Sequence, residues 1–354
     1  MSENWIQAMK SSGISREDDM GLYLRIAGIA FAVTIWVGGA SAQEAAPKDL
    51  AAPKDLAARV ELYAVPTLTL SDSQFLSGDP NAQAAVVTGE LSIAQGSGRL
   101  PVAVLMHGSG GIGGNVQYWK RLFNAEGIST FVIDGVTGRG FTGVGDKQAS
   151  LGRLNFILDI YRSLEILGKH PRVDPSKVVM VGFSRGGQAA LYSSVERFQK
   201  LWNKSGLDFA SYVVFYPDCG TTYRDDDKVS RKPIRIFHGS PDNYNPVSPC
   251  KAYVARLKQA GADVQLTEYP NAEHGFDNPL GANPPVPTKA DQSVRACKIR
   301  ENESAILLNE ATQKPFAYTD DCVSIGPTVG FNPEATKAAT AAVLEFVRST
   351  AGTK

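Results

Sequence analysis

The residues with the clearest chemical potential surround one serine. Ser184 stands in Gly182-Phe-Ser-Arg-Gly186, which fits the pattern G-x-S-x-G. The apolar run 178–181 predicts a buried strand before it, and residues 187–198 are compatible with a helix after it. A strand, a tight turn and a helix are the context in which this pattern exposes a nucleophilic hydroxyl. The alternative is a glycine-rich turn with an ordinary surface serine.

A serine hydroxyl needs a base within hydrogen-bond reach, and the base needs an orienting acid. The sequence has four histidines: His107, His170, His238 and His274. In this type of fold the chain order is Ser, then Asp or Glu, then His, which disfavours the first two as the base. His238 is expected to be a packed residue at a strand end. His274 follows the last expected strand and is predicted to be the base.

The orienting acid is expected in the loop after the strand 234–237. Asp242 lies in that loop, four residues beyond His238. The rivals are Asp218, Glu273 and the acidic run 225–227. The run is more typical of a solvated loop, and Glu273 is too close in sequence to orient its neighbour. Asp242 is therefore the predicted acid.

Acyl transfer also needs backbone donors for a developing oxyanion. One is expected to be the N–H of Arg185, directly after the serine. The second is expected from the loop 107–111, His-Gly-Ser-Gly-Gly, as the N–H of Ser109 with Gly110 as the alternative. That loop lacks the Lys-Ser or Lys-Thr of a phosphate-binding loop, which argues against nucleotide binding.

Two aromatic residues follow the oxyanion loop. Tyr118 and Trp119 could contact a substrate, and packing in the core explains them equally well. No motif indicates a metal site, because the sequence has neither a C-x-x-C pair nor clustered histidines.

Strands and helices alternate along most of the chain, which predicts a mostly parallel α/β sheet. Residues 60–70 and 85–93 read as antiparallel opening strands. The other strands are expected over residues 101–106, 129–133, 178–181, 212–215, 234–237 and 264–268. Further helices are expected over residues 116–125, 149–167, 247–260 and 333–348. Ligand chemistry should then take place at the carboxyl ends of the strands.

The Pro-rich segment 277–332 breaks this rhythm. It is expected to be an insertion with a helix near residues 290–308. Long excursions from a compact domain are usually functional or mobile. The segment is interpreted either as a partial cap near the site or as a disulfide-braced surface loop.

Composition limits the class of protein. The chain has 354 residues, of which 43% are hydrophobic, with 36 basic and 36 acidic side chains. This balance favours an ordinary globular protein and gives no support for nucleic-acid binding, which normally needs a basic face. The length allows one large domain.

The N-terminal region has the features of a signal peptide. Arg25 precedes the apolar run 26–37, and Ala-Ser-Ala precedes Gln43. Residues 1–42 are interpreted as this peptide, with Met20 as a possible true start and an uncleaved anchor as the alternative. Residues 43–58 hold a tandem AAPKDL repeat and are interpreted as a linker before a domain over 59–354. The protein is expected to be exported, periplasmic or secreted, with no stable membrane anchor after cleavage.

The cysteines fit an oxidising compartment. They are Cys219, Cys250, Cys297 and Cys322, and all lie in the part expected to be exported. Two disulfides are the simplest interpretation. The pairs Cys219–Cys250 and Cys297–Cys322 are favoured because each flanks one local segment.

The motifs at 107–111, 182–187, 238–242 and 273–276 together resemble the α/β-hydrolase fold and, more narrowly, the dienelactone hydrolase family. The resemblance covers about residues 83–275 and the last helix. It implies an eight-stranded sheet and hydrolysis of an ester or lactone through an acyl-enzyme, with no metal or cofactor. The best-known members of the family use a cysteine nucleophile, where this chain has Ser184.

The sequence therefore predicts an exported serine hydrolase that acts on a small-molecule ester or lactone. One alternative is a serine peptidase of the prolyl oligopeptidase type, although the chain lacks a propeller-sized N-terminal domain. An alternative of another class is a non-catalytic binding protein on a hydrolase scaffold.

Overall fold

The computed structural model describes residues 53–352. The chain divides into two units, Met1–Leu50 and Ala51–Lys354, and the described residues all belong to the second. The predicted signal peptide and residues 43–52 of the predicted linker lie outside the described range. Among helices within it, none is long and apolar enough to cross a membrane.

An eight-stranded sheet forms the centre of the described residues, in the order β1-β2-β4-β3-β5-β6-β8-β9. The first two strands are antiparallel to each other, β2 is antiparallel to β4, and the remaining pairs are parallel. This arrangement confirms the predicted mostly parallel sheet with antiparallel opening strands. The strands are β1 (Arg59–Thr69), β2 (Gln83–Ile93), β3 (Leu100–Met106), β4 (Ser129–Asp134), β5 (Val173–Phe183), β6 (Ser211–Phe215), β8 (Ile234–Gly239) and β9 (Val264–Tyr269).

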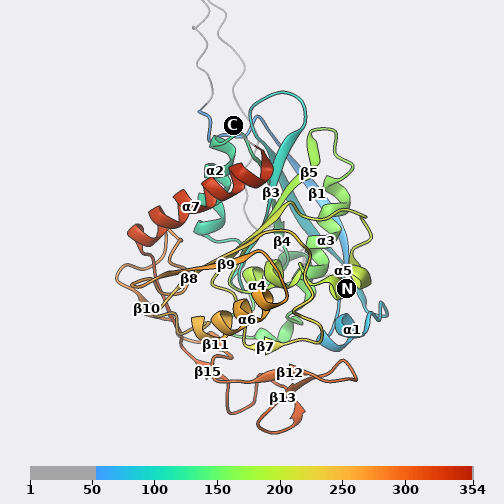
Figure 1. The fold of residues 1–354 in the computed structure, drawn as a ribbon, viewed down its shortest axis with the longest axis vertical. Helices are drawn as coiled ribbons and strands as arrows, with labels where there is room; N and C mark the ends of the chain where they lie inside the picture. Colours follow the sequence, from blue (N-terminus) through green and yellow to red (C-terminus); the bar gives the residue numbers. More distant parts are fainter. Residues whose placement is uncertain (1–52, 353–354) are drawn as a thin grey trace, which may run out of the picture. The chain divides into compact units, whose positions relative to one another are not determined.

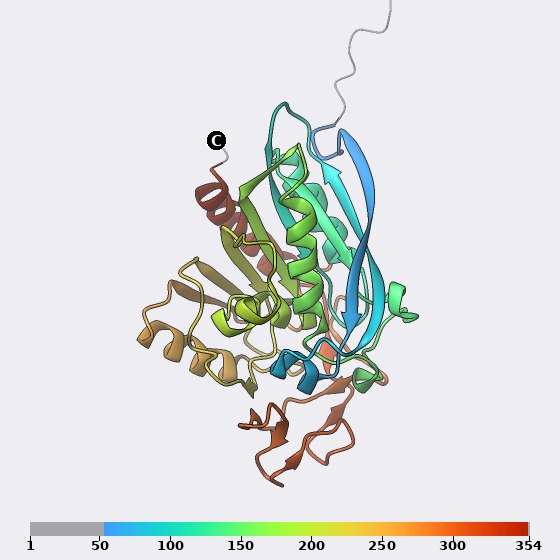
Figure 2. The same ribbon diagram turned by 90° about the vertical axis from the view of Figure 1, so that its right-hand side faces the viewer.

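Helices cover both faces of the sheet, which is why its central strands are continuously apolar. Along β3, Val104 and Met106 belong to the core under one layer of helices, and Leu105 belongs to the core under the other. Figure 2 shows α3 and α7 on opposite faces. The helices are α1 (Asp72–Ser77), α2 (Gly114–Ala125), α3 (Asn155–Leu167), α4 (Arg185–Tyr192), α5 (Glu196–Trp202), α6 (Val247–Gln259) and α7 (Pro333–Ala351), with short 3₁₀ turns η1 (Thr137–Arg139) and η2 (Gln148–Ser150).

Two helices differ from the prediction. The helix expected over 149–167 begins only at Asn155, whose side chain instead bonds to the backbone N–H and C=O of Leu70 at 2.8 Å each. The helix expected over 187–198 is divided into α4 and α5. The hydroxyls of Ser193 and Ser194 donate back to helix carbonyls there, and such bonds compete with helix continuation.

The helix expected near residues 290–308 is wrong, because short strands occupy this part of the insertion. The side chain of Asn302 accepts the N–H groups of Ser304 and Ile306, and this local bonding favours a turn over a helix. In Figure 1, β12 and β13 lie beyond β7, with which β12 pairs. The strands are β7 (Thr221–Thr222), β10 (Val286–Pro287), β11 (Gln292–Ser293), β12 (Ile299–Glu301), β13 (Leu307–Asn309), β14 (Lys314–Pro315), β15 (Ser324–Ile325) and β16 (Thr328–Val329).

Two disulfides join Cys219 to Cys250 and Cys297 to Cys322. This is the pairing that the sequence favours. The second bond lies entirely within the insertion, where it joins the two chain segments next to the paired strands β11 and β15.

Candidate active site

The turn between β5 and α4 holds Ser184 in a strained conformation, with φ 55° and ψ −117°. Non-glycine residues rarely adopt a positive φ, and such strain is concentrated at functional sites. Glycine is required on both sides of the serine because the chain segments touch. A Cβ on Gly182 would lie 2.0 Å from the carbonyl oxygen of Gly186, and one on Gly186 would lie 2.2 Å from that of Met106.

The structure brings Ser184, His274 and Asp242 together, although they are far apart in the sequence. The hydroxyl of Ser184 lies 2.8 Å from Nε2 of His274, and Nδ1 of His274 lies 2.8 Å from Oδ2 of Asp242. A carboxylate can only accept, so Nδ1–H donates to Asp242 and leaves Nε2 free to accept the serine proton. This is the geometry of a nucleophile, a base and an orienting acid.

Two backbone amides hold the carboxylate of Asp242 in place. Its other oxygen, Oδ1, accepts the N–H groups of Tyr244 at 2.8 Å and Asn245 at 2.9 Å. Asp242 is only 3% exposed and His274 only 5% exposed. Both oxygens of the buried acid therefore have donors, which fixes the direction in which it faces the imidazole.

Two tyrosines enclose the imidazole of His274, and the sequence analysis did not identify either one. The ring of Tyr244 stacks on it at 4.5 Å, and Tyr216 meets it at 4.6 Å in a T-shaped contact. Tyr216 has a positive φ of 37° and directly follows β6. Its position directly after a predicted parallel strand could have identified Tyr216 as a candidate site residue, because ligands bind at the carboxyl ends of the strands in such sheets.

The carboxylate of Asp277 binds the hydroxyl of Tyr216. It is fully buried and accepts the hydroxyl of Tyr216 at 2.6 Å and the indole N–H of Trp119 at 2.8 Å. Burial raises the pKa of the Asp277 carboxyl to about 6, although both donors lower it. This carboxyl therefore loses its proton at a higher pH than an ordinary aspartate does.

The two aromatic residues considered as substrate contacts lie elsewhere. Trp119 is buried in the core with its N–H on Asp277, and the hydroxyl of Tyr118 lies 2.8 Å from that of Thr340 in α7. Both pack in the core that α2 and α7 share with the sheet, and neither lines the two cavities that contain Ser184. The contacts of Tyr118 and Trp119 in the structure agree with the other interpretation, which is packing in the core.

The loop 107–111 passes against the serine, as an oxyanion loop must. A Cβ on Gly108 would lie 3.2 Å from the Cβ of Ser184. The N–H of Val144 donates to the carbonyl of Ser109 at 2.7 Å and so fixes the loop. Within residues 53–352 no acceptor is recorded for the N–H groups of Ser109, Gly110 or Arg185, so these amides are available as donors.

The remaining histidines have structural partners. Nε2 of His107 accepts the N–H of Gly135 at 3.0 Å, and its Nδ1 lies 2.6 Å from the carbonyl of Gly108. His170 faces Glu61 at 3.1 Å. His238 is buried 3.9 Å from Asp242, and burial lowers its pKa and favours the neutral ring.

The rival acids are also placed away from His274's ring nitrogens. Asp218 pairs with Arg153 at 3.0 Å, and Asp226 pairs with Arg256 at 2.7 Å. Glu273 has one buried oxygen without a hydrogen-bond partner, and burial together with the charge of Asp242 raises its pKa.

Two cavities open beside Ser184. The larger, about 240 Å³, is lined by the loop 108–111, Tyr216, Tyr244 and His274, and by Asp291 and other residues of the insertion. The smaller, about 30 Å³, is lined by Arg153 and Arg185 and by residues 292–294 of the insertion. The insertion therefore forms part of the wall of both cavities.

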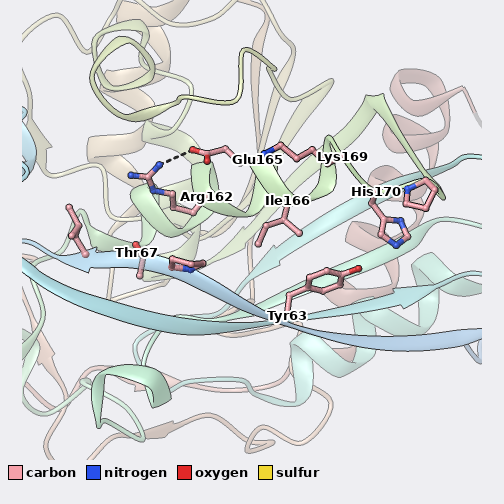
Figure 3. Close-up of a pocket in the computed structure, with 10 residues that line it drawn as sticks. Tyr63, Thr67, Arg162, Glu165, Ile166, Lys169 and His170 are labelled. Carbon is pink, nitrogen blue, oxygen red and sulfur yellow. Dashed lines mark hydrogen bonds and ion pairs between the residues drawn. The ribbon is translucent and has the colours of Figure 1, made fainter.

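A further cavity of about 650 Å³ lies between β1 and α3, and Figure 3 shows it. Its wall includes Tyr63, Ile166 and His170. Ser184, Asp242 and His274 are not part of that wall. Arg162 and Glu165 at its rim already pair with each other at 2.8 Å. No group of three or more acidic, histidine or cysteine side chains suited to a metal ion occurs in the described part of the chain.

The fold is that of an α/β-hydrolase. A dienelactone hydrolase of Klebsiella pneumoniae, described as putative, matches with a TM-score of 0.51 at 12% identity, over 81% of this chain and 98% of its own. A dienelactone hydrolase-like promiscuous phosphotriesterase from metagenomic libraries matches with a TM-score of 0.51 at 15% identity, over 82% and 98%. At these identities the likeness establishes the fold only.

The chain belongs to the dienelactone hydrolase family, whose sequence model matches residues 97–308, more than half of the chain. It is a hydrolase of that family, as the motifs suggested. A curated relative, acyl-protein thioesterase 1 of Gibberella zeae, is 30% identical over 103 residues. That match covers 28% of this chain and only 42% of the relative.

Proposed function

We propose that this protein is an exported serine hydrolase that cleaves a carboxylic ester or lactone through an acyl-enzyme on Ser184. The observation that supports this most directly is the position of His274, at 2.8 Å from both Ser184 and Asp242. Membership of a hydrolase family agrees with it.

In the acylation step, Oγ of Ser184 attacks the carbonyl carbon while Nε2 of His274 takes the hydroxyl proton. Asp242 stabilises the imidazolium that forms and keeps the ring in one tautomer. The carbonyl oxygen becomes an oxyanion that accepts the N–H groups of Ser109 and Arg185, with Gly110 as the alternative to Ser109. Losing one such donor typically costs on the order of 100- to 1,000-fold in rate.

Collapse of this intermediate breaks the bond between the carbonyl carbon and the leaving oxygen, which takes the proton from His274. A water molecule then attacks the acyl-enzyme and gives a proton to the same nitrogen. The second collapse releases the acid and returns that proton to Ser184. Every proton therefore passes through Nε2 of His274, and no cofactor is required.

Replacing the serine tests the proposal. Ser184→Ala is expected to abolish turnover of p-nitrophenyl acetate and to leave the melting temperature nearly unchanged, because it removes only the nucleophilic oxygen. Ser240→Ala, at an exposed serine near the end of β8, is the matched control and should retain wild-type turnover. Full activity in Ser184→Ala would contradict the assignment.

The same three residues could cleave other acyl compounds. The match to a thioesterase makes a thioester panel worthwhile, and a panel of short peptide amides tests the peptidase alternative. Labelling by a fluorophosphonate probe distinguishes any of these enzymes from a non-catalytic binding protein, which would not react.

Export is part of the proposal. Two disulfides support it, because such bonds persist in oxidising compartments and are rare in the cytosol. The expected destination is the periplasm or the medium.

A further inference from the structure

The position of His274 indicates which of the two cavities beside Ser184 receives the leaving group. This inference rests on the proposed function, in which His274 is the general acid. The general acid must reach the leaving oxygen, within about 3 Å. His274 lines the larger cavity beside Ser184 and is not part of the wall of the smaller one. The alcohol part of an ester therefore extends into the 240 Å³ cavity, and the acyl part extends toward the 30 Å³ cavity, which has room only for a small group.

The cavity that takes the alcohol has an acidic wall. Asp291 is the only Asp, Glu, Lys or Arg in its lining. Its carboxyl is half-buried, and it has no hydrogen-bond or ion-pair partner among residues 53–352. Unpaired carboxylates in partly buried positions favour a positive partner, because burial without one is costly.

Aromatic side chains complete this wall. Tyr216 and Tyr244 line the same cavity as Asp291. A carboxylate together with aromatic rings is the combination that recognises an ammonium group, since the ring faces also attract cations.

The insertion holds Asp291 firmly in this position. Its carbonyl accepts the N–H of Gly326 at 3.1 Å, and the next residue, Gln292, donates its N–H to Gly145 at 2.9 Å. Gln292 begins β11, which pairs with β15, and the Cys297–Cys322 bond closes the same region. The carboxylate is thus carried by a braced pair of strands.

We propose that Asp291 is a specificity-determining residue that selects esters of a short acyl group with an amino alcohol, by pairing with the ammonium group of the alcohol. An anionic alcohol would be rejected at the same place, because its charge would face Asp291.

A matched pair of esters tests this inference. Acetylcholine and 3,3-dimethylbutyl acetate have nearly the same shape and differ by one positive charge. At pH 8 and low salt, the wild type is expected to prefer acetylcholine by roughly 5- to 10-fold in kcat/KM, as for a partly exposed ion pair with aromatic contacts. The preference should shrink as salt is added.

Two variants locate the cause. Asp291→Asn is expected to bring the ratio of the two kcat/KM values close to one. Asp146→Asn removes an exposed negative charge near Asp291 and should retain the ratio. Thermal melts of both variants show whether they fold.

The possible results separate the two proposals. Equal turnover of the two esters by the wild type, or an unchanged ratio in Asp291→Asn, would overturn the inference alone. A preference for glyceryl acetate over acetylcholine that Asp291→Asn abolishes would also overturn it, in favour of a hydroxyl-binding site. Absence of turnover of every ester would overturn the proposed function and the inference with it.

Discussion

At the scale of single residues, the acids around His274 differ in the donors they receive. Asp242 accepts two backbone amides besides the imidazole, all from groups that are fixed in position. Asp277 accepts a tyrosine hydroxyl and an indole N–H in a fully buried place. Burial raises the pKa of the Asp277 carboxyl to about 6, although both of its donors lower it.

The raised pKa of Asp277 predicts a pH-dependent stability. A carboxyl that binds its proton more tightly in the folded state than in the unfolded chain favours folding at low pH, and this contribution is lost as the pH rises from about 4 to about 6. Asp277→Asn removes that dependence. The free energy of unfolding of the wild type, relative to this variant, should fall by about 2 kcal/mol between pH 4 and pH 7.

Urea unfolding of both proteins across this pH range measures the difference. Asp227→Asn, at an exposed acid, is the matched control and should run parallel to the wild type. A constant difference between the wild type and Asp277→Asn would show that burial does not hold the proton on this carboxyl.

At the scale of elements, the insertion gains its order from the disulfide and from short strand pairs rather than from a helix. The Cys297–Cys322 bond closes a loop with a sequence separation of 25 residues. Constraining a loop of this length in the unfolded chain is worth about 3 kcal/mol. The Cys297→Ser/Cys322→Ser double variant is therefore expected to lose about that much stability.

The same variant should also raise KM for esters, because Asp291 lines the larger cavity and residues 292–294, next to the bond, line the smaller one. Ser304→Ala, an exposed residue of the same insertion, is the control and should change neither quantity. Wild-type KM in the double variant would show that the cavity walls are held without the disulfide.

The elements also show what the sequence could predict. Buried strands such as 101–106 and 178–181 could be predicted from the sequence, because a short apolar run between helices is stable only when it is buried inside the sheet. The strands of the insertion could not be predicted from the sequence, since they are only two or three residues long and depend on partners such as β7. The helix predicted there failed for this reason.

The site was predictable to the extent that its residues carry local motifs. Ser184, Asp242 and His274 each lie in a recognisable loop, and the structure brings them within 2.8 Å of their partners. Tyr216, Tyr244 and Asp277 have no motif, because their contribution is a tertiary contact. Asp291 likewise lies in no recognisable motif.

At the scale of the whole molecule, the proposed export explains why disulfides brace a domain that already has a large core. Expression of the full sequence in a bacterium is expected to yield a periplasmic protein that begins at Gln43, because a signal peptidase should cleave after Ala42. N-terminal sequencing checks the start, and free-thiol counting should find none in the mature protein. A start upstream of residue 26 would favour the anchor alternative.

The central claim is that Ser184 becomes acylated, and a fluorophosphonate probe with peptide mapping tests it most directly. The probe reacts irreversibly with an activated serine, so the adduct does not depend on how fast water releases an acyl group. The account predicts an adduct on the peptide that contains Ser184, and no adduct in Ser184→Ala. An adduct at another residue, or an unlabelled wild-type protein, would contradict it.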